Sequence, residues 1–318
     1  MSSQSETQSN PYEILSKELM RELRADKRRS FLFKLLTWTY IIVTTVAVFG
    51  LFYGYSRGNS KPGADDPHVG VVDVFGAIQR KGGVAANPTI EALTNAFAQE
   101  QSTSIVLDMD SPGGSPVQSD LIYREILRLR AEHPNKPVIA VVGDICASGC
   151  YYIASAADEI VINRVSMVGS IGVRLDGFGF TGLMEKLGVE RRTLTAGENK
   201  ILADPFSEVN PEVKAHLSEH VLHKTHMVFI DAVRQGRGAR LQDDPSLFTG
   251  LVWVGEEAID KGLADRIGSV QSVARELAKD GNQVNYSIRQ PRIIDWFTGS
   301  AASVIQNLVS SDMRLSLK

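Results

Sequence analysis

The chain has 318 residues, 43% of them apolar, and a formal net charge of -3 at pH 7. This length suits one large folded domain with extensions, since single domains usually hold about 100–200 residues. The near-neutral charge offers no basic surface for phosphates, so nucleic acid is not expected as a partner.

The first distinctive segment is an apolar stretch at residues 35–55, in which tyrosine is the only ionisable residue type. As a helix it would be roughly 31 Å long, close to the roughly 30 Å hydrocarbon core of a bilayer. A cleaved signal peptide would have a shorter apolar region that begins nearer the first residue. We therefore expect a polar segment at 1–34, a single transmembrane helix at 35–55 and a linker at 56–67.

Basic residues are distributed unequally about this stretch. Six precede it closely and two follow at a comparable distance: Arg21, Arg24, Lys27, Arg28, Arg29 and Lys34 on one side, and Arg57 and Lys61 on the other. Because cytoplasmic flanks carry the excess of Lys and Arg, the amino terminus is expected in the cytoplasm and the bulk of the chain across the membrane.

Residues 68–289 alternate short apolar runs with amphipathic ones, without an internal repeat. This alternation predicts one α/β domain. The expected strands are 69–75, 104–109, 137–142, 159–162, 170–173 and 191–195.

Helix starts are predicted where a capping residue precedes proline. Three places have this pattern: Asn87-Pro88, Ser115-Pro116 and Asn210-Pro211. The last of them begins a long helix over 211–234, and the second begins a crossover helix between two strands. The tail at 290–318 is amphipathic and either lies on a membrane surface or packs on a neighbouring copy; the sequence does not choose between the two.

Two segments follow the second and third expected strands directly, at 108–114 (DMDSPGG) and 146–154 (CASGCYYIA). Consecutive parallel strands joined by a helix bring their carboxyl ends to the same edge of the sheet, so these segments should be neighbours. Gly113 and Gly114 offer backbone amides, and Ser148 offers a hydroxyl. Each feature alone also fits an ordinary turn or helix cap, but together they favour acyl transfer.

The two cysteines, Cys146 and Cys150, lie on either side of Ser148. An exported domain favours disulfides, yet two cysteines within one helical turn would be poorly oriented for one. We expect two small buried side chains that pack beneath the serine turn, with a cysteine nucleophile as a minor alternative.

A serine nucleophile needs a base, and the histidines do not supply an obvious one. None of the six lies at a strand tip that the serine turn should reach: His68, His133, His216, His220, His223 and His226. A lysine with a lowered pKa is the remaining candidate, although composition does not say which lysine. Three of the histidines share one helical stripe, but no acidic residue is in phase to complete a metal site. The stripe, together with His226, is expected to be a solvent-facing or intersubunit polar surface.

Four segments in order carry a family resemblance: SPGG at 111–114, ASGCYYIASAAD at 147–158, VGSIGV at 168–173 and GENKILADPF at 197–206. Together they resemble the signal peptide peptidase A (SppA) family, over about 68–289. These proteins are membrane-anchored serine proteases with a ClpP/crotonase-like fold of repeated β-β-α units. The single domain is similar to the short form of the family.

The resemblance implies a role for five residues. Ser148 would be the nucleophile and Lys200 the general base, with Ser170 positioning the lysine amine. The amides of Gly114 and Gly149 would form the oxyanion hole. No cofactor or metal is implied. One departure is position 150, where the family usually has glycine or alanine and this chain has cysteine.

The resemblance also implies partners and a location. Short forms assemble into rings, here an octameric ring on the outer, periplasmic face of the inner membrane, with serine and lysine from adjacent subunits. Residual signal peptides and unfolded or hydrophobic exported segments would be the substrates, bound in extended form. Two alternatives stay open: a crotonase-like acyl-CoA enzyme that uses only the Gly-Gly amides, and a non-catalytic membrane scaffold.

Overall fold

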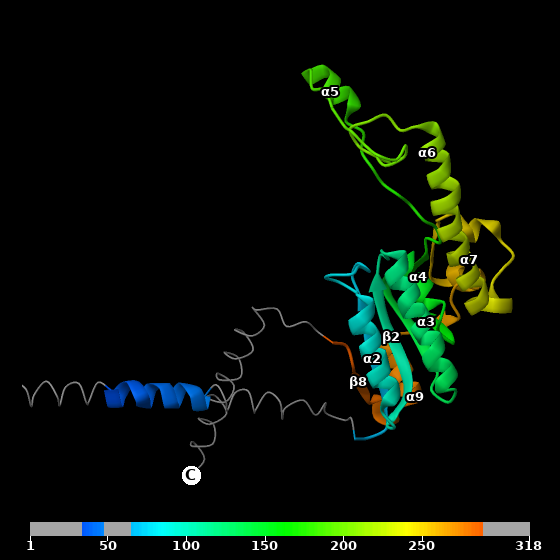
Figure 1. Ribbon diagram of the computed structural model, residues 1–318. Helices are drawn as coiled ribbons and strands as arrows, with labels where there is room; N and C mark the ends of the chain where they lie inside the picture. The colour runs from blue at the N-terminus through cyan, green and yellow to red at the C-terminus, as the bar shows by residue number, and fades with distance from the viewer. Residues whose placement is uncertain (1–33, 48–64, 289–318) are drawn as a thin grey trace, which may run out of the picture. The chain divides into compact units, whose positions relative to one another are not determined.

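The computed structural model describes residues 34–47 and 65–288, and the chain divides into two units, Met1–Lys61 and Pro62–Lys318. In the first unit, residues 34–47 form a helix (Figure 1). Its large apolar side chains are exposed. Within the described residues, no helix combines the length and the apolar character needed to span a bilayer. The other residues of the predicted segment 35–55, most of the linker and the tail from 290 lie outside this description.

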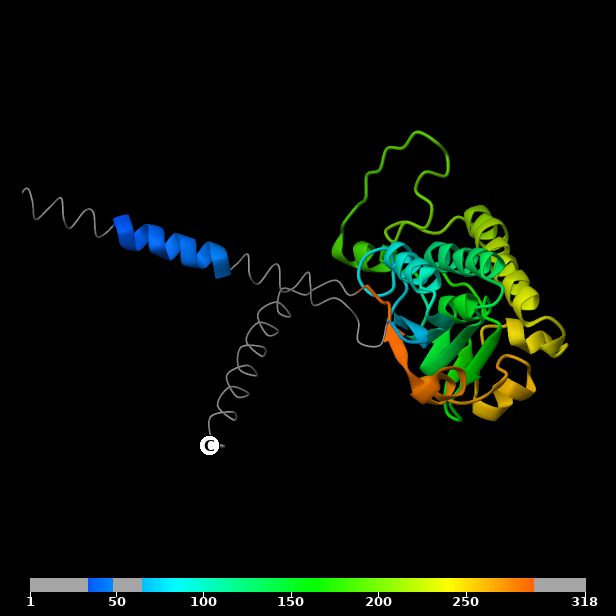
Figure 2. The ribbon, with the colours of Figure 1, turned by 90° about the horizontal axis from the view of Figure 1, so that it is seen from below.

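The second unit is built on an eight-stranded sheet in the order β6-β5-β3-β2-β1-β8, with β4 paired to β3 and β7 (Figure 2). Every strand pair is parallel except β5 with β6. The strands are β1 His68–Phe75, β2 Ser102–Ser111, β3 Val138–Ala147, β4 Glu159–Ile162, β5 Met167–Gly169, β6 Val252–Val254, β7 Arg266–Ile267 and β8 Gln283–Asn285. The mixed α/β class with a parallel sheet is confirmed.

Helices lie on both faces of this sheet. They are α2 Ala86–Ala98, α3 Pro116–Glu132, α4 Gly149–Ala154, α5 Thr181–Leu187, α6 Pro211–His216, the π-helix η1 Leu217–His223, α7 Lys224–Arg237, α8 Gly255–Asp260 and α9 Val270–Leu277. Three short 3-10 turns are η2 Gly238–Arg240, η3 Pro245–Phe248 and η4 Lys279–Gly281. The larger core cluster packs α2, α3, α4 and α7 on one face, and a smaller cluster packs α9 on the other. Alternate residues of β1 and β2 belong to the two clusters, because strand side chains alternate between faces.

Two of the three predicted helix starts are confirmed. The Ser115 side chain accepts from Gln118 N at 3.4 Å at the start of α3, and Asn210 accepts from Glu212 N at 2.9 Å at the start of α6. The third is wrong, since α2 begins at Ala86. The Gln118 side chain of α3 accepts the Ala86 N–H at 3.0 Å, and this replaces a local cap.

Two predicted strands are also wrong. Residues 170–173 are not a strand, because Ser170 has φ of 50° and ends the extended backbone after β5. Residues 191–195 are exposed and irregular, and they lie in a segment at 174–210 that we call the arm. The arm carries α5 and extends away from the sheet (Figure 1). Its apolar side chains are exposed: Leu175, Phe178, Phe180, Leu183, Leu187, Val189, Leu194, Ile201, Leu202, Phe206 and Val209.

Candidate active site

The ends of β2 and β3 meet, as the sequence predicts. Ser111 of β2 pairs with Cys146 of β3, and α3 is the crossover between the two parallel strands. Gly113 has φ of +91°, and a Cβ on it would lie 2.8 Å from the Ser148 Cβ and 2.7 Å from Gly149 N. Only glycine allows this approach, so the glycine tip and the serine turn form one structure.

Ser148 stands between β3 and α4 with φ of 53° and ψ of -122°. Few residues other than glycine adopt positive φ. Its N–H donates to Gly169 O at 2.8 Å, and its carbonyl accepts from Tyr152 N at 3.0 Å. The hydroxyl occupies the N-cap position of α4 but makes no capping hydrogen bond. Ser148 is therefore not a structural cap, and its hydroxyl is available for chemistry.

The amides of Gly114 and Gly149 lie close together beside this hydroxyl. A Cβ on Gly149 would be 3.3 Å from Gly114 N and 2.4 Å from Ser119 Oγ. Gly149 is the first residue of α4, where an N–H has no partner within the helix. The neighbours of Gly114 are held by Ile78, through Ile78 N to Gly113 O at 2.9 Å and Ser115 N to Ile78 O at 2.8 Å. The two backbone amides and the Ser148 hydroxyl thus line one part of the structure.

A pocket of about 360 Å³ opens at the serine. Its lining comes from the two tips and from α3, α4 and α7: Gly114, Pro116, Val117, Ser119, Asp120, Leu121, Ser148, Gly149, Tyr152, Gly172, Lys224, Thr225, Val228 and Phe229. Apolar side chains prevail, as in sites that bury an apolar group of a ligand.

Two polar groups of the pocket wall have partners already. The Tyr152 hydroxyl donates to Asp120 Oδ1 at 2.9 Å, and Arg124 Nε lies 2.8 Å from Asp120 Oδ2. Burial, together with this hydrogen bond, raises the pKa of Tyr152 well above its ordinary value. Tyr152 is thus not suited to take a proton from Ser148.

The two predicted residues that support the serine are placed differently. Ser170 directly follows Gly169, the acceptor of the Ser148 N–H, and its own N–H donates to Leu251 O at 2.7 Å. Lys200 lies on the arm, exposed and outside the pocket. A single chain therefore brings Ser170 to the serine turn but not Lys200, whose predicted partner is the serine of an adjacent subunit.

Sequence reasoning missed Lys224, the lysine that lines the pocket with Ser148. It is the first residue of α7, inside the long helix predicted at 211–234. Which side chains of that helix face the domain depends on the π-helical turn η1, because this turn shifts the following residues out of α-helical phase. In the sequence, the apolar residues around Phe229 are the signal that this end of the helix packs on the domain, and Phe229 is buried.

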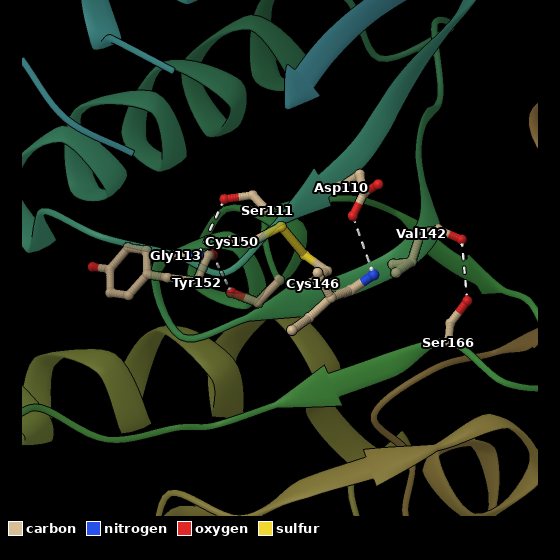
Figure 3. Close-up of a disulfide and its surroundings, with 10 residues drawn as sticks. Asp110, Ser111, Gly113, Val142, Cys146, Cys150, Tyr152 and Ser166 are labelled. Atoms are coloured by element: carbon tan, nitrogen blue, oxygen red, sulfur yellow. Dashed lines mark hydrogen bonds between the residues drawn. A yellow bond between two sulfur atoms is a disulfide. The ribbon is translucent and has the colours of Figure 1, made fainter. Parts of the chain in front are cut away.

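The expectation of free thiols is wrong, because Cys146 and Cys150 form a disulfide (Figure 3). The two residues do not share a helical turn: Cys146 belongs to β3 and Cys150 to α4. The positive φ of Ser148 reverses the chain between them and brings their Cα atoms to 5.1 Å. Neither sulfur is a thiol, which removes the alternative of a cysteine nucleophile.

The histidine stripe is exposed at His216, His220 and His223. The rings of His216 and His220 have centroids 4.9 Å apart, whereas His226 Nε2 lies 3.1 Å from Ile171 O. Among residues 34–47 and 65–288, no group of His, Cys, Asp or Glu is arranged to hold a metal ion.

Asp108, near the end of β2, has an unusual carboxyl. Burial raises its pKa to about 6, and the nearby carboxylates of Asp73 and Asp110 contribute. Asp110 itself accepts a hydrogen bond from Ile145 N at 3.3 Å, which supports the last residues of β3 next to the disulfide (Figure 3). These carboxyls shape the strand ends and do not line the serine pocket.

The family model "Peptidase family S49" matches residues 130–285, which include Ser148, Ser170 and Lys200. A Na(+)/H(+) antiporter NhaA of Brucella melitensis is 42% identical over 235 residues, which are 72% of this chain and 31% of that protein. The chain thus spans about a third of that relative's length, so the transport activity in the relative's name is not assigned to this chain.

Two protease relatives match over much of the chain. A putative protease of Synechocystis sp. is 30% identical over 210 residues, covering 65% of this chain and 72% of that protein. Serine protease SPPA, chloroplastic, of Arabidopsis thaliana is 30% identical over 254 residues, covering 74% of this chain and 37% of that protein. With the family model and the serine turn, these matches establish that the chain belongs to peptidase family S49.

Proposed function

We propose that the protein is a membrane-anchored serine endopeptidase with Ser148 as nucleophile and Lys200 as general base. The observation that carries this proposal is the uncapped Ser148 hydroxyl beside the paired Gly114 and Gly149 amides. The lysine amine takes the hydroxyl proton as Oγ attacks a peptide carbonyl, and the two amides stabilise the oxyanion. The lysine then protonates the leaving amine, and water hydrolyses the acyl-enzyme.

The base would come from a second copy. In one chain Lys200 is on the arm and the pocket lacks it, while the arm exposes apolar side chains that favour contact with another surface. An octameric ring, in which each arm reaches the next copy, would complete every site. Ser170, beside the serine turn, would hold the lysine amine in place.

The substrates would be residual signal peptides and unfolded or hydrophobic exported segments. The apolar walls of the pocket support this class, because they suit an apolar side chain of an extended peptide. Serine and lysine carry both proton transfers, so the chemistry requires no cofactor.

The location would be the inner membrane, with an anchor at 35–55 and the catalytic domain on its periplasmic side. Within the described part of that helix, Thr39, Thr44 and Thr45 hydroxyls donate to carbonyls one turn earlier, which suits an apolar surrounding. The Cys146–Cys150 disulfide also supports export, since disulfides persist in oxidising compartments.

Labelling with a fluorophosphonate tests the proposed nucleophile. The full-length protein in membranes should be labelled at Ser148, and Ser148→Ala should abolish both labelling and peptide hydrolysis. Ser155→Ala is the matched control, because Ser155 is a buried serine at the other end of α4. Labelling that persists in Ser148→Ala, or is absent from the wild type, would contradict the proposal and favour the acyl-CoA enzyme or the scaffold.

A further inference from the structure

The disulfide closes a small ring that contains the proposed nucleophile. Cys146 and Cys150 are four positions apart, so the ring encloses Ala147, Ser148 and Gly149. Both sulfur-bearing side chains are fully buried in the larger core cluster. The bridge, drawn in Figure 3, therefore lies in the protein interior and joins the two ends of the segment that contains Ser148.

Each end of the ring is fixed to a different part of the fold. Cys146 is paired in the sheet with Ser111 of β2 and Val168 of β5. Cys150 is in the first turn of α4, a helix buried along its whole length. The disulfide thus ties the last residues of the sheet to the start of the helix, across the turn that presents Ser148.

Besides the disulfide, the turn is held by the close approach of Gly113 and by hydrogen bonds at Ser148, none of which is covalent. Ser148 has positive φ, a conformation that is unfavourable for a residue with a side chain. Its N–H bond to Gly169 O and its carbonyl bond to Tyr152 N hold it. Relaxation to ordinary φ would rotate the Gly149 amide and move Oγ, and both are needed at one carbonyl.

We propose that the Cys146–Cys150 disulfide positions Ser148, so that opening the bridge slows acylation of the serine without weakening binding in the pocket. This inference rests on the proposed function. A dithiol opens the bridge by giving two electrons and two protons: the S–S bond breaks, two S–H bonds form, and the dithiol becomes a cyclic disulfide. Cys146 and Cys150 are positioning residues, since neither sulfur lines the pocket.

The direct test compares the full-length wild type with the double variant Cys146→Ala/Cys150→Ala. The rate constant for fluorophosphonate acylation at saturation should fall roughly 10- to 100-fold, with the half-saturating probe concentration unchanged. Tyr151→Phe is the matched control: it removes the buried bond from the Tyr151 hydroxyl to Leu263 O at 2.7 Å in the same helix. Its acylation rate should stay at the wild-type value even if its melting temperature falls.

Reduction and reoxidation supply a second readout. Wild type treated with dithiothreitol, with both thiols verified by alkylation and mass spectrometry, should lose the same factor and regain it on reoxidation. The double variant should not respond to the reductant. A wild-type acylation rate in the double variant would overturn this inference but leave the proposed function standing. If the oxidised wild type is not labelled at Ser148, the proposed function fails and the inference falls with it.

Discussion

Ser148 combines two properties: it precedes a helix without capping it, and it has positive φ. Sequence could predict the serine turn, because small residues follow an apolar strand at 146–149. It could not predict the disulfide, since the expected orientation of Cys146 and Cys150 assumed helical geometry on both sides of Ser148. The bridge closes so short a loop that its removal should cost only about 2 kcal/mol, which leaves the fold intact.

Asp108 leads to a prediction on stability. Its folded-state pKa of about 6 exceeds the ordinary 3.8, so the folded protein holds this proton more tightly than the unfolded chain. The resulting stabilisation is complete below about pH 3.8 and is lost as pH rises through about 6. Asp108→Asn should therefore raise the free energy of unfolding at pH 8, relative to wild type, by about 1 kcal/mol after allowance for partial exposure.

Denaturant unfolding at several pH values measures this effect. The difference between Asp108→Asn and wild type should grow from pH 4 to pH 8 and then level off. Asp243→Asn, which changes an exposed carboxylate, serves as the control and should show no such trend. A difference that does not vary with pH would rule out the buried carboxyl as its cause.

At the scale of elements, the β2 tip and the serine turn approach each other so closely that Gly113 has no room for a side chain. Gly113→Ala would place a Cβ 2.6 Å from Ala147 O and 2.8 Å from the Ser148 Cβ, both on the serine turn. The two tips would have to separate, which should remove nearly all peptidase activity and cost about 1–3 kcal/mol of stability. Activity assays and thermal unfolding check both effects.

Gly76→Ala separates this clash from the backbone preference. Gly76 also has positive φ, of +83°, at the end of β1, but a Cβ there would meet nothing within 4 Å. Its variant should lose some stability and keep its activity. Equal activity losses in Gly76→Ala and Gly113→Ala would mean that the close approach of the tips is not what matters.

Sequence predicted the elements that bury apolar faces within one chain. Strands β1 to β4, the start of α3 and the long helix from Pro211 follow from alternation and capping, which are local. The arm was not predictable in this way. Its residues 191–195 have the composition of a strand, yet no described strand pairs with them, and a strand without a partner leaves its backbone groups unpaired.

At the scale of the whole molecule, a base supplied by an adjacent copy predicts complementation. Ser148→Ala and Lys200→Met proteins should each be inactive alone. Mixed and allowed to exchange subunits, they should recover about a quarter of wild-type activity, because random neighbours pair an intact serine with an intact lysine that often. Peptide hydrolysis before and after mixing measures the recovery.

Lys224→Met is the control for the lysine that lines the pocket. This variant should be active on its own, without mixing with a second variant, since Lys224 is not the proposed base. An inactive Lys224→Met protein together with an active Lys200→Met protein would transfer the base to α7 and to the same chain as the serine.

On the proposal that the arm of one copy supplies the base to the next, a copy without a neighbour would be inactive. A newly exported protomer would be latent, unable to digest itself or its neighbours during maturation, and hydrolysis would begin only when crowding in the bilayer brings copies together. Dilution would then inactivate the protein without an inhibitor, and the total peptidase activity would rise more steeply than the protein concentration.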